Sequence, residues 1–141
     1  MTPRQQDTVD MLHAIGCSCV IDDGNSVTVC RRRGVIDLLH ILRTTPSLLA
    51  GSFIADKVVG KGAAALMAVG GVSAVYADTI SQSALDMLQT AGITVSYGVC
   101  VPAIINRAGT GICPVEQLCA DISDPSRCIP LIESFVKNNQ P

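Results

Sequence analysis

One sequence pattern occurs twice within residues 51–92, and it limits the folds open to this chain. Each copy is an apolar run rich in β-forming residues, an aspartate, a turn of small residues and a helix closed by glycine. The aspartates are Asp56 and Asp78, and the helical segments are Ala63–Val69 and Ala84–Leu88. Two strand-turn-helix units in series predict parallel strands joined by crossover helices. The amino ends of both helices should therefore lie side by side at one edge of the sheet.

The segments on either side complete a single α/β domain. Apolar spacing, with capping residues, prolines and glycines at the ends, predicts helices over 3–15, 35–43, 103–107 and 124–137, and one that begins at Cys113-Pro114. Alternating apolar residues predict a hairpin over 17–29 and further strands over 48–55 and 93–100. At 141 residues with 48% hydrophobic content, the chain can bury one core, so we expect one domain over residues 1–141.

Composition and charge argue against several classes of function. The net charge of −2 lacks the basic footprint of a general nucleic-acid-binding protein, so we expect no nucleic-acid partner. The run Arg31-Arg32-Arg33 fits a solvated strand end, or alternatively a rim that faces an anion. Residues 1–10 lack the apolar core of a signal peptide, and glycines and polar residues interrupt every long apolar run. We therefore expect a cytoplasmic protein with no membrane partner.

The seven cysteines have irregular spacing, which fits a reducing compartment. Cys17 and Cys19 would point to the same face of a strand, but no second pair stands at a zinc-like spacing. We interpret both as packing residues and expect neither a metal nor a cofactor. Cys113 differs, because it is predicted to start a helix beside the loop Gly109-Thr110-Gly111, where a thiolate is favoured. It is a candidate nucleophile, although both histidines are distant in sequence and a cap or core role is the alternative.

The strongest candidate for a binding site is the start of the first repeat helix. Gly60-Lys61-Gly62 combines unpaired backbone N–H groups, the positive end of a helix dipole and a lysine, with Lys57 close by. Such a site suits a phosphate or carboxylate, although the P-loop pattern is absent and the glycines could instead serve close packing. Asp56 and Asp78 could act as a paired acid and base, or form salt bridges with these lysines.

The first repeat helix, Ala63–Val69, has no polar residue on any side. A helix that is apolar all round must be buried all round. Either other elements of the domain cover it, or it packs in an interface between subunits, for which its small alanines are suited. We therefore predict a homo-oligomer.

Several motifs resemble those of a known bacterial family. They are Arg33-Gly34-Val35, Ala55-Asp56-Lys57-Val58-Val59-Gly60-Lys61-Gly62, Ile80-Ser81, Val101-Pro102, Ile105-Asn106-Arg107 and Gly109-Thr110-Gly111-Ile112-Cys113-Pro114-Val115-Glu116. On these residues the chain is similar to the family called domain of unknown function 1893. The resemblance implies a three-layer αβα sandwich with a central mixed sheet and a cytidine-deaminase-like fold, with a cleft where deaminases bind their base.

The same comparison argues against zinc-dependent deamination. A zinc deaminase needs H-x-E at the first helix start and P-C-x-x-C at the second, for the metal, the activated water and the proton shuttle. This chain has Gly60-Lys61-Gly62 and Ile80-Ser81-Gln82-Ser83 at those places, no histidine after His40 and no C-x-x-C.

Three hypotheses for function remain open, and the sequence does not decide whether the chain is an enzyme. In the first, the cleft binds a small anionic molecule such as a nucleotide. The candidate ligand-binding residues are Lys57, Gly60, Lys61, Gly62, Ser81, Asn106 and Arg107. In the second, the chain is a transferase-type enzyme with Cys113 as nucleophile, and Asp56 is the other candidate catalytic residue. In the third, it is a non-catalytic oligomeric scaffold.

Overall fold

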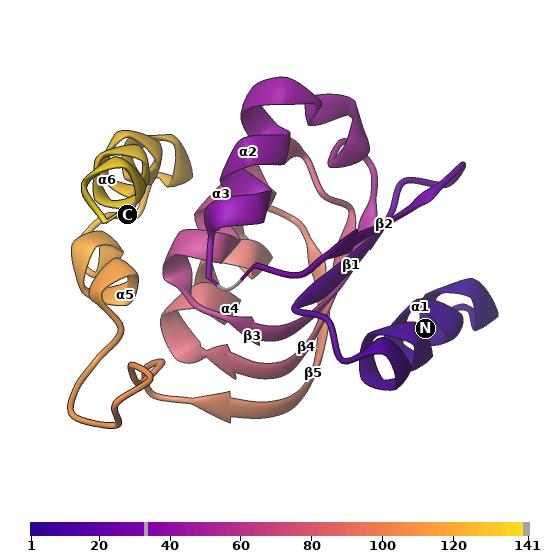
Figure 1. Ribbon diagram of the computed structural model, residues 1–141, viewed down its shortest axis with the longest axis horizontal. Coiled ribbons are helices and arrows are strands. Elements are labelled where there is room, and N and C mark those ends of the chain that lie inside the picture. Colours follow the sequence, from indigo (N-terminus) through magenta and orange to yellow (C-terminus); the bar gives the residue numbers. More distant parts are fainter. Residues whose placement is uncertain (33, 140–141) are drawn as a thin grey trace.

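The computed structural model describes residues 1–32 and 34–139 and contains a five-stranded mixed sheet with helices on both faces (Figure 1). In chain order the elements are α1 (Pro3–Ile15), β1 (Cys19–Asp22), β2 (Val27–Cys30), α2 (Ile36–Thr44), the 3₁₀ helix η1 (Pro46–Leu48), β3 (Phe53–Val59), α3 (Lys61–Gly70), β4 (Ala74–Ser81), α4 (Gln82–Thr90), β5 (Thr94–Val101), α5 (Pro114–Cys119) and α6 (Pro125–Asn138). The strand order is β2-β1-β3-β4-β5. The predicted α/β class with a mixed sheet is confirmed.

The repeated sequence pattern forms two consecutive crossover units, β3-α3-β4 and β4-α4-β5. The three strands of these units are parallel, whereas β1 runs antiparallel to both β2 and β3. Gly60 is the N-cap residue of α3 and Ser81 is the N-cap residue of α4. Because β3 and β4 are parallel neighbours, the amino ends of their helices lie at the same edge of the sheet, as predicted.

The helices are divided unequally between the two faces of the sheet. On one face α1 packs against β1 and β3. On the other face lie α2, α3 and α4, and beyond them α5 and α6 pack against α3 (Figure 1). After β5 the chain therefore turns back, and α5 and α6 pack against α3, which precedes β5 in the sequence.

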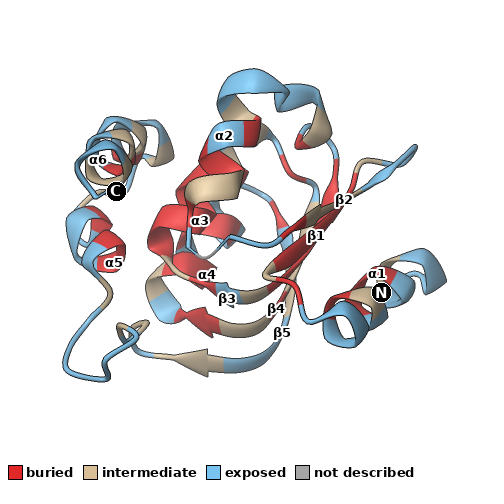
Figure 2. Ribbon diagram, viewed as in Figure 1, coloured by how far each residue is buried: buried red, intermediate tan, exposed pale blue. Residues whose placement is uncertain are grey.

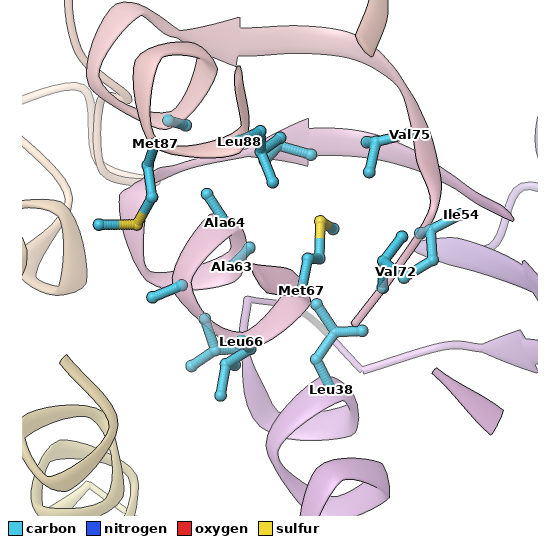
Figure 3. Close-up of a cluster of buried hydrophobic side chains, with 14 of the residues drawn as sticks. Leu38, Ile54, Ala63, Ala64, Leu66, Met67, Val72, Val75, Met87 and Leu88 are labelled. Carbon is cyan, nitrogen blue, oxygen red and sulfur yellow. The ribbon is translucent and has the colours of Figure 1, made fainter. Parts of the chain in front are cut away.

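Helix α3 is the centre of the larger core. Its residues Lys61 to Met67 are all buried, and Figure 2 shows α3 among the most buried elements. Leu66 and Met67 pack among side chains of α2, β3, β4 and α4 (Figure 3). Except at its end, where Val69 is exposed, the apolar helix is thus covered within the domain, which removes the main reason for placing it in a subunit interface. No helix in the described part of the chain is both long and apolar enough to cross a membrane.

Capping residues fix the ends of α1 as the sequence predicts. The Thr2 hydroxyl accepts a hydrogen bond from the Gln5 backbone N–H, and the Gln5 side chain accepts one from the Thr2 backbone N–H. Gly16 ends the helix in the left-handed conformation, with φ at 71°. The helix is thereby held at a defined length against the sheet.

Two predicted elements differ from the structure. Residues 103–107 do not form a helix, because the backbone N–H of Ile104 donates to Glu116 and its carbonyl accepts from Cys113. Five residues are also too few for a stable isolated helix. The strand predicted over 48–55 begins only at Phe53 and continues to Val59. Pro46 starts a 3₁₀ turn before it, so Asp56 lies inside β3 and not at its end.

The contact between α3 and α5 leads to a prediction at Gly62. A Cβ atom at this position would lie 2.3 Å from Cγ1 of Val115. Gly62→Ala should therefore lower the free energy of unfolding by about 1–3 kcal/mol, although alanine normally favours a helix. Urea denaturation measures the change. Combination with Val115→Ala should remove the loss, and a loss of equal size in that background would contradict the packing explanation.

Candidate functional site

The carboxylate of Glu116 joins the starts of the two repeat helices. Its Oε1 accepts hydrogen bonds from the Lys61 backbone N–H at 2.8 Å, the Ser81 hydroxyl at 2.8 Å and the Ser83 hydroxyl at 3.2 Å. Its Oε2 accepts from the Ile104 backbone N–H at 2.7 Å. Glu116 is only 6% exposed. Helix α5 therefore inserts one buried negative charge at two positive helix ends.

This arrangement changes the predicted anion site. The two helix starts do meet, but the anion that they hold is part of the chain itself. Ser81 is fully buried, and its hydroxyl also caps α4 by accepting from the Ala84 backbone N–H. Lys61 is buried as well, and its Nζ donates to the Ala120 carbonyl at the end of α5, 2.9 Å away. Neither Lys61 nor Ser81 lines the neighbouring cleft.

A cleft of about 710 Å³ opens beside this junction. It lies between the sheet, the starts of α2 and α3, the loop before α5, and the end of α6. Seven residues singled out from the sequence line it: Asp56, Lys57, Gly60, Gly62, Asn106, Arg107 and Cys113. The tertiary structure thus brings most of the candidate residues together around one cleft. The cleft lies next to the starts of α3 and α4, but Lys61 and Ser81 at those starts do not line it.

Positive side chains surround the cleft. Arg31, Arg32, Lys57 and Arg107 all line it. Arg32 pairs with Asp37 through Nε and Oδ1, 2.5 Å apart. Within residues 1–32 and 34–139, no ion pair includes Arg31, Lys57 or Arg107. Arg33, the third residue of the basic run, lies outside the described residues. Three acidic residues, Asp37, Asp56 and Glu116, also line the cleft, so among the described residues basic side chains exceed acidic ones there by one, on a chain whose net charge is negative.

Asn106 contributes to the cleft mainly by holding its loop. The Asn106 amide nitrogen donates to the Thr110 hydroxyl at 3.1 Å, and its amide oxygen accepts from the Thr110 backbone N–H at 3.0 Å. The same loop is closed by a bridge between Ile105 and Ile112. These contacts leave the exposed Arg107 as the cationic side chain that the loop presents.

Asp56 is the buried acid of the cleft. It is 8% exposed, and its Oδ1 accepts only a long hydrogen bond, 3.3 Å, from the Val58 backbone N–H. Burial raises the pKa of Asp56 to about 7, against the opposing effect of the Val58 and Lys57 N–H groups, and the charge of Asp78 adds a smaller increase. A carboxyl group with this pKa can take up and release a proton near neutral pH.

Asp78 does not form the predicted acid-base pair with Asp56. The Asp78 carboxylate accepts from the Tyr76 hydroxyl at 2.7 Å and lies 2.7 Å from Nε2 of His13 on α1. Its side chain therefore faces α1, whereas Asp56 lines the cleft on the opposite side of the sheet. The reason is the alternation of side chains along a strand, because Asp56 pairs in register with Ala77 and not with Asp78.

Cys113 lines the cleft without the base that nucleophilic catalysis needs. It is the N-cap residue of α5, a helix of only six residues, and its backbone N–H donates to the Ile104 carbonyl. Of the two histidines, His13 lies on the α1 face and His40 lines a separate shallow hollow near Arg31. No histidine lines the cleft among the described residues. The structure therefore favours a structural role for this cysteine.

Two residues of the cleft were not recognised from the sequence. Cys19 was interpreted as a packing residue and Cys30 was not considered, yet both line the cleft. They face each other across the hairpin of β1 and β2. The two cysteines are equally spaced from the four-residue turn over 23–26, each three positions from the pair Asp22 and Val27, but the sequence predicts a turn over only three of those residues. Glu116 was noted only as a residue of a helix start, and nothing in the sequence pattern shows that it reaches two other helices.

Comparison with known proteins identifies relatives by family and by fold. The family model described as domain of unknown function (DUF1893) matches residues 7–136. The structure is similar to the crystal structure of a DUF1893 family protein (TM1506) from Thermotoga maritima, with a TM-score of 0.87 and 24% sequence identity over 96% of this chain and 92% of that chain. No curated protein matches the chain. At this sequence identity the structural likeness shows that the fold is shared, and it does not show whether an activity is shared.

The position of Glu116 leads to the second prediction. Glu116→Ala removes the acceptor of four hydrogen bonds and should lower the free energy of unfolding by about 3–5 kcal/mol. Glu133→Ala is the matched control, because Glu133 pairs with Arg43 at the surface and should cost less than about 1 kcal/mol. Urea denaturation of both variants measures the difference. Equal losses would contradict the role of Glu116 as the junction.

The raised pKa of Asp56 leads to the third prediction. In the unfolded chain the carboxyl regains its ordinary pKa of 3.8, so between about pH 4 and pH 7 the folded state keeps a proton that the unfolded state has lost. The contribution of Asp56 to the free energy of unfolding therefore falls as the pH rises from about 4 to about 7. Asp56→Asn should raise the free energy of unfolding at pH 8 by up to about 4 kcal/mol and change it little near pH 4.

Denaturation of wild type and Asp56→Asn at both pH values measures this effect. Asp124→Asn is a control of opposite sign, because its hydrogen bonds to Ser126 lower the pKa of Asp124 and the substitution should cost stability at pH 8. A gain for Asp56→Asn that is equal at the two pH values would show that Asp56 does not titrate as described.

Proposed function

Because the chain belongs to the DUF1893 family, whose description names no activity, we propose a function from the cleft itself: it binds a small anionic molecule such as a nucleotide or a related phosphorylated metabolite. The observation that carries the proposal is the set of three cations, Arg31, Lys57 and Arg107, around one cleft and without an ion-pair partner in the described part of the chain.

The chemistry of these cations suits phosphate. A guanidinium group can donate two parallel hydrogen bonds to phosphate or carboxylate oxygens, and an ammonium group adds a compact positive charge. Arg31 and Arg107 come from different elements, Arg31 from the end of β2 and Arg107 from the loop before α5. A ligand with charge at one end or on a flexible chain could therefore be held by two elements of the structure.

The remaining surface of the cleft suits the uncharged part of such a ligand. Val35, Ile104, Val115 and Phe135 line it, and apolar residues provide most of its wall. A volume of about 710 Å³ lies within the usual range for sites that hold small molecules. A nucleotide combines a phosphate for the rim with a flat ring for an apolar wall, so it is the first class to test.

The proposal includes a distant relation to the cytidine deaminases without their chemistry. The order of helix, hairpin, helix and alternating strands and helices supports that relation, as does the meeting of the starts of α3 and α4. On this relation, Gly60-Lys61-Gly62 and Ser81 would stand in place of the zinc-binding motifs that a deaminase needs at its two helix starts. Binding is therefore proposed for the cleft, and zinc-dependent deamination is not.

The two other hypotheses gain no support from particular contacts. A Cys113 nucleophile has no histidine beside it in the described part of the cleft. A homo-oligomer and a cytoplasmic location stay predictions, and the first no longer has the argument from α3, which the domain itself covers.

The fourth prediction tests binding by thermal unfolding in the presence of inorganic phosphate and a panel of nucleotides. A ligand at one hundred times its dissociation constant should stabilise the wild type by about 2.7 kcal/mol. Lys57→Ala and Arg107→Ala should each reduce this stabilisation, because they remove rim charges. Arg127→Ala on α6 removes an equal charge outside the cleft and should leave it unchanged.

Lys61→Ala separates this proposal from the one based on sequence. Since Lys61 donates to Ala120 and does not line the cleft, the variant should be less stable without ligand and should keep the ligand-induced stabilisation. Absence of stabilisation of the wild type by every member of the panel would overturn the proposed function.

A further inference from the structure

Three reactive side chains form a row across the sheet at the floor of the cleft. Cys30 on β2 pairs in register with Cys19 on β1, and Cys19 pairs in register with Asp56 on β3. Residues directly opposite each other on neighbouring strands share one face of the sheet. All three line the cleft, and their exposed fractions are 3%, 4% and 8%.

The two cysteines are directly opposite each other on neighbouring antiparallel strands. Directly opposite residues of antiparallel strands have Cα atoms about 4.5–5.5 Å apart, which lies within the range found for disulfides. Both thiols are free. The two thiols also interact closely enough for each to shift the pKa of the other.

The surroundings divide the two thiols into a nucleophile and a protected partner. The interaction with Cys19 lowers the pKa of Cys30; burial and the charges of Asp37 and Asp56 oppose this shift, and the charge of Arg32 adds a small decrease. The same interaction, burial and the charge of Asp56 raise the pKa of Cys19 well above its ordinary value. A thiolate is therefore favoured at Cys30, which is the form that attacks a disulfide.

Asp56 has a geometry that fits a proton acceptor for Cys19. It is its direct neighbour in the sheet, it is more than nine-tenths buried, and within residues 1–32 and 34–139 it has no ion-pair partner. Among the described residues, its side chain accepts the long hydrogen bond from the Val58 N–H, and the Lys57 N–H acts on the same carboxyl group. A buried carboxyl that has no ion-pair partner in the described part of the chain, beside a buried thiol, has no evident packing role.

We propose that Cys19 and Cys30 form a redox-active dithiol that reduces a small disulfide entering the cleft, with Asp56 as the proton acceptor for Cys19. This activity goes beyond anion binding and does not require it. It uses the floor of the cleft, whereas the proposed anion contacts lie at the rim.

The reaction proceeds in two exchanges. The Cys30 thiolate attacks one sulfur of the substrate, the substrate S–S bond breaks, and the first thiolate leaves with the proton released by Cys30. Asp56 then takes the proton of Cys19, whose sulfur attacks Cys30 and breaks the mixed disulfide. The second thiolate leaves and receives that proton. Two electrons pass from the protein to the substrate, which becomes two thiols while Cys19 and Cys30 become a disulfide.

The test exposes the folded, fully reduced protein to glutathione disulfide at neutral pH, with thiol alkylation and peptide mass spectrometry at successive times. The wild type should form a Cys19–Cys30 bridge and release glutathione. Cys30→Ser should slow the release at least tenfold. Cys19→Ser should instead accumulate a mixed disulfide between Cys30 and glutathione, because the second exchange is lost.

Two further variants complete the test. Asp56→Asn should form the mixed disulfide at the wild-type rate and close the bridge at least tenfold more slowly, which a merely structural role would not produce. Cys128→Ser is the matched control, because Cys128 and Cys119 form a second neighbouring pair of buried thiols that does not line the cleft. It should react as the wild type does.

The experiment on the wild type alone can overturn the proposal. The test therefore still decides if one of the variants fails to fold. A bridge that involves Cys17 or Cys113, or a Cys19–Cys30 bridge that forms only when urea unfolds the chain, would do so. Cys30→Ser should keep any stabilisation by phosphate or nucleotides, so failure of the redox activity and failure of anion binding are separate outcomes.

Discussion

The buried carboxylate of Glu116 is the contact on which the arrangement of the site depends. It satisfies donors at the starts of α3 and α4 and the Ile104 N–H in the loop before α5. Those donors would otherwise be buried without partners, at a cost of several kcal/mol. In return, Lys61 of α3 donates to the end of α5 at Ala120. The two helices are thus tied in both directions, and this fixes the wall of the cleft.

Because Glu116 occupies the starts of α3 and α4, the groups that can contact a ligand lie on the neighbouring strands and loops. Two positive helix ends without a partner would attract a phosphate, but here an internal carboxylate has that place. What the cleft offers a ligand is therefore a rim of arginine and lysine side chains and a floor made by Cys30, Cys19 and Asp56. The rim and the floor differ in chemistry, and each can be tested without the other.

The sheet topology explains why this floor exists. β1 has β2 on one side and β3 on the other, both antiparallel to it, so residues from three distant parts of the chain stand in one row. α1 covers the other face of β1 and β3, where Asp78 binds His13. Asp56, which faces the cleft, is buried without an ion-pair partner among residues 1–32 and 34–139 and has a raised pKa, whereas Asp78 on the other face has polar partners.

The sequence by itself determined the local elements and their order, because apolar period, capping residues and the repeated strand-helix pattern are properties of neighbouring residues. It predicted correctly that the starts of α3 and α4 would meet, and it placed Asp56, Lys57, Arg107 and Cys113 among the candidates. Only the tertiary structure decided which groups occupy that meeting point. Glu116, Cys30 and the direction of Lys61 depend on where α5 and the hairpin return in space, and such long-range contacts leave no periodic signal along the chain.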